Sequence, residues 1–171
     1  MYHVLTTASY FDDAQHGFRP HRSCETLLAH TIGNISRLRD LRKHCCCFIF
    51  RLSKAFDSVS HRKLLFMLNR LGFHPEILQY IEIFLVGHLQ YVALDNFLST
   101  SRMVTSGAPQ GPVLGPLLFL VYENDLPAQL RSFCRLFAGD VILYNKSNNR
   151  SVLKQDPQHL KKWGKSWQMF F

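Results

Sequence analysis

The spacing of apolar side chains predicts five helices along the chain. From 23 to about 42, apolar residues recur at steps of three and four, which is the period of a helix with one buried face. This period assigns to the buried face Leu28, Ile32, Ile35 and Leu38. We expect Ser23 to cap the first turn of this helix. The same period predicts further helices over 61–73, 75–87, 113–126 and about 157–171.

Three other stretches have the pattern of strands. Residues 45–52 form a short apolar run, and 89–107 has the pattern of a hairpin that turns near Asp95-Asn96. A second hairpin is expected where RLFA and VILY flank a tight turn at Gly139-Asp140. This order of elements predicts the α+β class, with a small antiparallel sheet backed by helices. Residues 1–14 show no pattern and are expected to be poorly ordered, which leaves 15–171 as one domain.

Composition and charge narrow the function classes. With 47% hydrophobic residues the chain can build a sizeable core, and its net charge of +8 suggests an anionic partner, although a merely basic domain is the alternative. Five cysteines, three of them contiguous, do not form a disulfide framework, so we expect reduced thiols and an intracellular (cytoplasmic or nuclear), not secreted, protein. No apolar run approaches the ~20 residues that span a bilayer, so no membrane partner is expected. The pattern leaves the oligomeric state open.

Five segments occur in an order and spacing that resemble the reverse transcriptase domain of non-LTR, LINE-type retrotransposons. They are QHGFRPHRSCETLL (15–28), LSKAFDSVSHRKLL (52–65), SGAPQGPVLGPLLFLVYENDLP (106–127), LFAGDVILY (136–144) and WGKSWQMFF (163–171). The resemblance implies a reverse transcriptase palm with part of the fingers, and no thumb or endonuclease. It also implies, for a functional member of the family, an RNA template or RNA–DNA hybrid as partner and Mg²⁺ as cofactor.

The metal-binding positions of that family are occupied by other residues in this chain. The family has one aspartate on its first catalytic strand and two adjacent aspartates at the hairpin, and here these positions are Arg51, Gly139 and Asp140. Transfer of a nucleotide uses two cations about 3.5–4 Å apart, and Mg²⁺ prefers carboxylate oxygens. An arginine stays protonated and cannot bind a metal, so it would take the place of the cation. Asp140 is then a catalytic and metal-binding remnant, or simply a turn aspartate.

Other family positions are retained. The resemblance makes Phe56 the aromatic residue against which the nucleotide sugar packs and Gln110 a contact to the incoming nucleotide; the alternatives are a core Phe and a solvated Gln. It places Arg19 and Arg22 near the template, although a solvated basic cluster is equally consistent with the sequence. Glu123 replaces an apolar residue, which is costly if that helix face is buried.

Two functional interpretations follow. The first is an RNA-directed DNA polymerase domain by descent, catalytically inactive because its metal ligands are replaced, with no Mg²⁺ bound. The second is a non-catalytic module that binds RNA or RNA–DNA hybrid through its basic surface.

Overall fold

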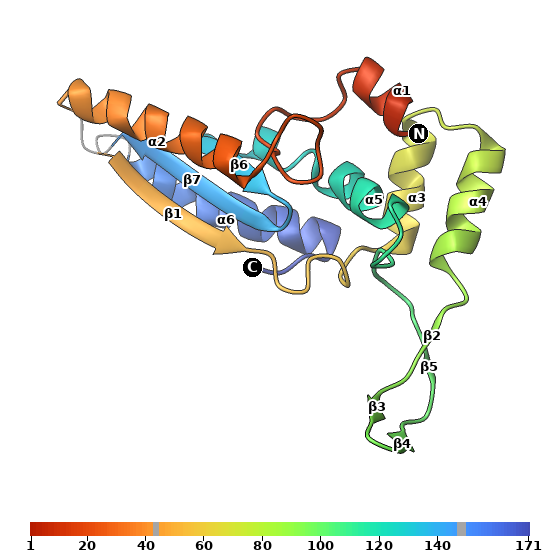
Figure 1. Ribbon diagram of the computed structural model, residues 1–171. Coiled ribbons are helices and arrows are strands. Elements are labelled where there is room, and N and C mark those ends of the chain that lie inside the picture. The colour runs from red at the N-terminus through yellow and green to blue at the C-terminus, as the bar shows by residue number, and fades with distance from the viewer. Residues whose placement is uncertain (43–44, 147–149) are drawn as a thin grey trace.

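Helices lie on both sides of a small antiparallel sheet in the computed structural model, which describes residues 1–42, 45–146 and 150–171 (Figure 1). The first half of the chain contains α1 (Tyr2–Thr7), α2 (Cys24–Asp40), β1 (Cys45–Arg51), α3 (His61–Arg70) and α4 (Pro75–Leu85). A projecting arm follows, made of β2 (Leu89–Gln90), β3 (Ala93–Leu94), β4 (Phe97–Leu98) and β5 (Arg102–Met103). The last part contains α5 (Leu114–Glu123), the 3₁₀ helix η1 (Pro127–Gln129), β6 (Phe133–Phe137), β7 (Asp140–Lys146) and α6 (Arg150–Trp167).

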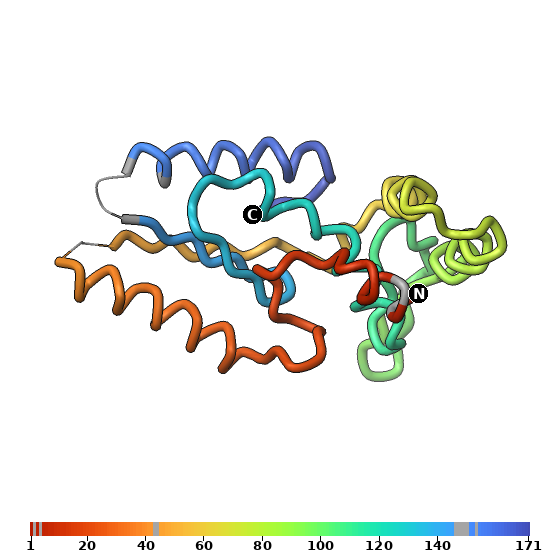
Figure 2. Tube along the Cα trace, turned by 90° about the horizontal axis from the view of Figure 1, so that it is seen from above, coloured from red at the N-terminus to blue at the C-terminus, as the bar shows by residue number. Residues whose placement is uncertain are grey.

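The main sheet has three strands in the order β1-β7-β6, and all pairs are antiparallel. Seen from above, α2 lies on one face of this sheet and α6 on the other (Figure 2). The register sets Arg51, the last residue of β1, opposite Asp140, the first residue of β7. These observations confirm the predicted α+β class and the small antiparallel sheet, and they bring together two positions that are far apart in the sequence.

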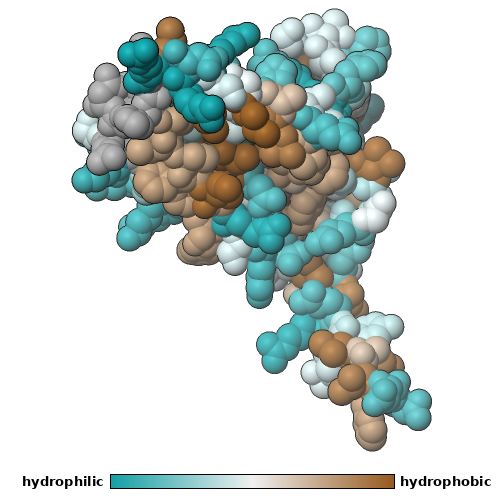
Figure 3. Space-filling model, turned by 60° about the vertical axis from the view of Figure 1, so that its left-hand side comes forward, coloured by the Kyte–Doolittle hydropathy of each residue, from teal (hydrophilic) through white to brown (hydrophobic). Residues whose placement is uncertain are grey.

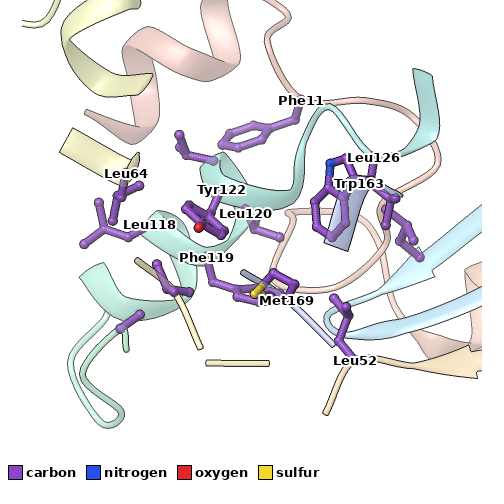
Figure 4. Close-up of a cluster of buried hydrophobic side chains, with 14 of the residues drawn as sticks. Phe11, Leu52, Leu64, Leu118, Phe119, Leu120, Tyr122, Leu126, Trp163 and Met169 are labelled. Atoms are coloured by element: carbon purple, nitrogen blue, oxygen red, sulfur yellow. The ribbon is translucent and has the colours of Figure 1, made fainter. Parts of the chain in front are cut away.

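The core centres on α5, which is apolar all round and is buried on nearly every side. Its side chains Leu118, Phe119 and Tyr122 lie between α3 and the end of α6 (Figure 4). A glycine is required near the start of this helix, because a Cβ at Gly115 would stand 2.1 Å from the carbonyl oxygen of Pro109. The PQG loop is thereby packed directly against the first turn of α5.

The arm between α4 and α5 extends away from the body of the molecule (Figures 1 and 3). It turns where predicted, since Leu94 pairs with Phe97 and Asp95 takes a φ of 51°. Its strands pair over only two residues each, and it exposes the apolar side chains of Leu89, Tyr91, Val92, Leu94, Phe97, Leu98 and Met103. The arm therefore contributes little to the core.

Two predicted helices differ from the structure in their details. The helix α2 begins after Ser23, whose side chain accepts a hydrogen bond from the N–H of Thr26 as expected of a cap. Its buried residues are Leu27, Thr31 and Leu38. Leu38 is buried as predicted and Ile35 is half-buried, whereas Leu28 and Ile32 are exposed, so the prediction was wrong in the first half of the helix, where the buried positions lie one residue earlier. The sheet packs against a neighbouring stripe of the helix, and periodicity alone does not select between adjacent stripes.

The last helix is longer than its pattern indicated. It begins at Arg150, and Pro157 lies inside it and not at its start. The residue before the proline, Asp156, is fully buried and accepts hydrogen bonds from the backbone N–H groups of Arg131 and Ser132, both at 3.0 Å. This tertiary anchor holds the helix in place where proline removes a backbone hydrogen bond.

The first 14 residues are packed onto the domain. They contain α1, and the side chains of Leu5, Phe11 and Ala14 are buried. All five cysteines are free thiols, and only Cys134 is buried. Its burial raises the pKa of the Cys134 thiol to about 12.

Candidate active site

The hairpin that carries Gly139 and Asp140 turns one residue earlier than predicted. Phe137 pairs with Asp140, so the two turn residues are Ala138 and Gly139, and Ala138 takes the left-handed φ of 48°. Asp140 is consequently a strand residue, with its position fixed by pairing on both sides.

An ion pair joins the two strands at this point. The Nε of Arg51 donates to Oδ1 of Asp140 at 2.8 Å, and its second terminal nitrogen donates to Oδ2 at 3.4 Å. The side chains are 80% and 43% exposed, so water screens the pair. Hydrogen bonding to Asp140, followed by the charge of that carboxylate, raises the pKa of Arg51. A fixed positive charge therefore lies beside the one remaining carboxylate.

Gly139 is held close to the chain that follows β1. The N–H of Leu52 donates to the carbonyl oxygen of Gly139 at 2.8 Å. A Cβ at position 139 would stand 2.8 Å from the Cβ of Ala55, which is too close for an unperturbed contact. The backbone here leaves no room for an aspartate unless Ala55 or the turn moves.

The residues present do not fit a pair of Mg²⁺ ions. The three positions that bind metal in the family carry one positive charge, no charge and one negative charge, in the order Arg51, Gly139 and Asp140. Across 1–42, 45–146 and 150–171, no three His, Cys, Asp or Glu side chains converge in a way that could hold a metal ion. The nearby Asp57 is engaged elsewhere, because its Oδ1 accepts from Nε2 of Gln110 at 3.3 Å.

The two candidate nucleotide contacts are joined through the segment after β1. Phe56 is half-buried and stacks on Phe119 with ring centroids 4.5 Å apart, while Phe18 meets its edge at 5.8 Å. The carbonyl oxygen of Phe56 accepts from the N–H of Ala108, just before the PQG loop. Gln110 is exposed and lines a cleft of about 830 Å³ between this loop, the base of the arm and the segment 54–60.

Arg19 and Arg22 are committed to contacts within the protein. Arg22 donates to the carboxylate and the carbonyl oxygen of Asp13, and Arg19 donates to the carbonyl oxygen of Asp12 at 2.6 Å. Their side chains are only 16% and 24% exposed, and Arg19 also lies 5.7 Å from the ring centre of Phe11. These two arginines fasten the first 14 residues to the loop that follows them, a role that the sequence did not indicate.

Glu123 lies in the core, as its position on the apolar helix implied. It is 1% exposed; its Oε1 accepts from Nε2 of Gln15, and its Oε2 has no hydrogen-bond partner. Burial raises the pKa of Glu123 well above the usual value. Gln15 also accepts from the N–H of Ala138 at 3.1 Å, so this buried pair connects α5 to the turn that carries Gly139.

The neighbouring polar residues complete a network that sequence analysis missed. Asn124 accepts from the N–H of Asp12 and donates to the carbonyl oxygen of Tyr10. Asp125 accepts from the indole N–H groups of Trp163 at 2.7 Å and Trp167 at 3.1 Å. Tyr122 also donates to the carbonyl oxygen of Trp167. We call residues 122–125, whose side chains all bind distant segments, the α5 clasp. The run of polar residues directly after an apolar helix was the available sequence signal.

Comparison with known proteins identifies the family of the chain. The family model described as "Reverse transcriptase (RNA-dependent DNA polymerase)" matches residues 1–171, so the chain belongs to the reverse transcriptase family. Within that family it is of the non-LTR retrotransposon type, which confirms the resemblance seen in the sequence.

Three relatives from Drosophila melanogaster illustrate the similarity. The chain is 25% identical over 165 residues to the RNA-directed DNA polymerase from mobile element jockey, covering 90% of the chain and 18% of that protein. The probable RNA-directed DNA polymerase from transposon BS is 27% identical, with 96% and 19% covered, and that from transposon X-element is 30% identical, with 84% and 15% covered. The chain thus spans less than a fifth of these relatives. None of the helices described here is long and apolar enough to cross a membrane.

Proposed function

We propose that this chain is a reverse transcriptase palm that does not catalyse DNA synthesis. The observation that supports the proposal is the Arg51–Asp140 ion pair. The pair forms where β1 lies beside the β6–β7 hairpin. In the family, the corresponding strands bring the metal-binding aspartates together. The antiparallel pairing of these strands fits a palm, whereas the charges of Arg51 and Asp140 do not fit a metal site.

The lost chemistry can be stated position by position. Two Mg²⁺ ions would lower the pKa of the primer hydroxyl and neutralise the triphosphate. Here the guanidinium of Arg51 neutralises Asp140, and Gly139 supplies no oxygen ligand. Phe56 and Gln110 remain as candidate contacts to a nucleotide sugar and base, and Asp140 remains as a single weak ligand.

Primer extension tests this proposal. We expect the purified chain to extend no primer on poly-rA with Mg²⁺ or Mn²⁺, and Asp140→Ala should give the same background. Extension by the parent chain that disappears in Asp140→Ala would contradict the proposal. Because a Cβ at 139 meets Ala55, restoring metal binding should require Arg51→Asp and Gly139→Asp together with Ala55→Gly, and Mn²⁺ binding followed by electron paramagnetic resonance reads this out without activity.

The second candidate function is binding of RNA or RNA–DNA hybrid without catalysis, and the net charge of +8 favours it. Such binding rests on release of counterions and has an expected Kd on the order of 10⁻⁴–10⁻⁶ M at physiological salt. Arg19 and Arg22 would contribute only by exchanging Asp13 for a phosphate. Titration of labelled strands and hybrids at several salt concentrations decides it; no binding at low salt would refute this function.

A further inference from the structure

Half of the net charge of the chain is concentrated on one helix. The sequence of α6 contains five Lys or Arg and one Asp, a formal charge of +4 against +8 for the whole chain. The single acid, Asp156, is fully buried and is held by the backbone N–H groups of Arg131 and Ser132, so it lies on the inner side of the helix. The exposed basic side chains, which we call the lysine ridge, are Lys154, Lys161, Lys162 and Lys165.

The ridge points away from the core. Leu160 and Trp163 fill the buried face of α6, and the lysines occupy the opposite side of the helix. Among the α6 side chains that the structure describes, the exposed ones are Ser151, Lys154, Gln155, Gln158, Lys161, Lys162, Lys165 and Ser166. None of these is apolar or acidic. From Lys154 to Lys165 the ridge is about 16 Å long at the helical rise, enough to follow a short stretch of phosphates.

Aromatic side chains line a depression on each flank of the ridge. On one side, Lys161 and Lys165 border an apolar groove of about 590 Å³ that contains Phe50, Phe170 and Phe171. On the other, a pocket of about 420 Å³ is lined by two basic residues, Lys162 and Arg131, and by Trp163 and Trp167, together with the single acid Asp125. Cations beside aromatic surfaces are the usual means of binding single strands, since phosphates meet the cations and bases stack on the rings.

We propose that the lysine ridge and its aromatic flanks bind single-stranded nucleic acid. This surface lies on the face of the sheet opposite α2 (Figure 2). The inference rests on the proposed nucleic-acid-binding function and specifies where that binding occurs. A membrane surface is disfavoured, because a helix that lies on lipid needs apolar side chains among its outward residues, and none of the exposed α6 side chains that the structure describes is apolar.

A charge-matched pair of variants tests the location. Lys161→Glu/Lys165→Glu changes the ridge, and Arg37→Glu/Arg39→Glu makes the same change of charge on exposed positions of α2, across the sheet. With labelled oligo-rA, we expect the ridge variant to bind at least about tenfold more weakly. The slope of log K against log salt concentration should be smaller in magnitude by about 1.4, the value for two lost phosphate contacts on a single strand. The α2 variant should keep the parental slope.

Two further measurements separate the outcomes. Both tryptophans of the chain lie in α6, so strand binding at the ridge should change the tryptophan emission of the parent and not that of the ridge variant. Phe170→Ala should weaken binding of a single strand and leave duplex binding unchanged. If the two charge variants lose affinity equally, or the α2 variant loses more, nucleic acid does not bind at the lysine ridge. The proposed binding function itself would remain supported. If no nucleic acid binds at low salt, both the binding function and its location on the lysine ridge are refuted. If the ridge binds anionic vesicles but not oligo-rA, its ligand is a lipid surface and not nucleic acid. A cooperative thermal unfolding transition like that of the parent confirms that each variant is folded.

Discussion

The α5 clasp and the Arg51–Asp140 pair show how differently one chain can treat two sets of polar residues. The clasp lies at the end of a buried helix, and its side chains contact Tyr10, Gln15 and α6, while Gln15 in turn accepts from the N–H of Ala138 in the hairpin turn. The ion pair lies at an exposed strand end. In the part of the chain that the structure describes, its side-chain hydrogen bonds join only Arg51 and Asp140 to each other. The clasp thus joins buried parts of the fold that are far apart, whereas the ion pair joins two neighbouring strands at the surface.

This difference in burial sets how much each group of side chains should contribute to stability. A buried carboxylate that loses its partners incurs the full cost of desolvation, whereas an exposed one exchanges a partner for water. Loss of the Arg51 side chain should therefore cost little stability, whereas loss of a clasp side chain that leaves a buried partner without a hydrogen bond should cost more. The following predictions test this contrast.

Removal of Asp125 should have the largest effect. Asp125→Ala leaves the indole N–H groups of Trp163 and Trp167 without their acceptor, and we expect a loss of about 3 kcal/mol in the free energy of unfolding. Urea denaturation followed by circular dichroism measures it. The matched control is Asp140→Ala, an exposed carboxylate, for which the midpoint should stay near that of the parent. Equal shifts of the two midpoints would contradict the contrast.

Restoring an aspartate at position 139 should also destabilise the fold. Gly139→Asp forces a Cβ against Ala55, and overpacking of this kind costs about 2 kcal/mol. Adding Ala55→Gly removes the opposing methyl group and should recover most of that loss. A double-mutant cycle on unfolding midpoints gives the coupling, and additive effects would show that Ala55 is not the obstacle.

Glu123 should make stability depend on pH. Its pKa is raised in the folded state, so its contribution is fully present below the unfolded value near 4.5 and is lost as the pH rises toward the folded pKa. In that window the penalty grows by about 1.4 kcal/mol per pH unit. Glu123→Gln cannot ionise, so it should match the parent near pH 4 and become more stable than the parent at neutral pH. A constant difference between the two from pH 4 to pH 7 would refute a buried, titrating Glu123.

The smallest effect concerns thiol reactivity. Cys24 and Cys47 are exposed and should react first with a disulfide reagent, while Cys134, whose pKa is raised to about 12 by burial, should react only on unfolding. Counting modified thiols in native and denatured chain, with Cys134→Ala as control, measures this. Fast native modification of Cys134 would show that the β6 side of the core opens readily.

The sequence by itself determined the α+β class and the order of the main helices and strands from α2 to α6. Helical and strand periods arise from neighbouring residues, so Ser23 as a cap and the turn at Asp95 could be predicted locally. The tertiary structure alone decided which stripe of α2 is buried, why α6 continues through Pro157 and that Arg51 binds Asp140 across 89 positions of sequence. It also decided that Arg19 and Arg22 hold Asp13 and that Gln15 holds Glu123, because hydrogen-bond partners of this kind are chosen by packing between distant segments and leave no periodic trace.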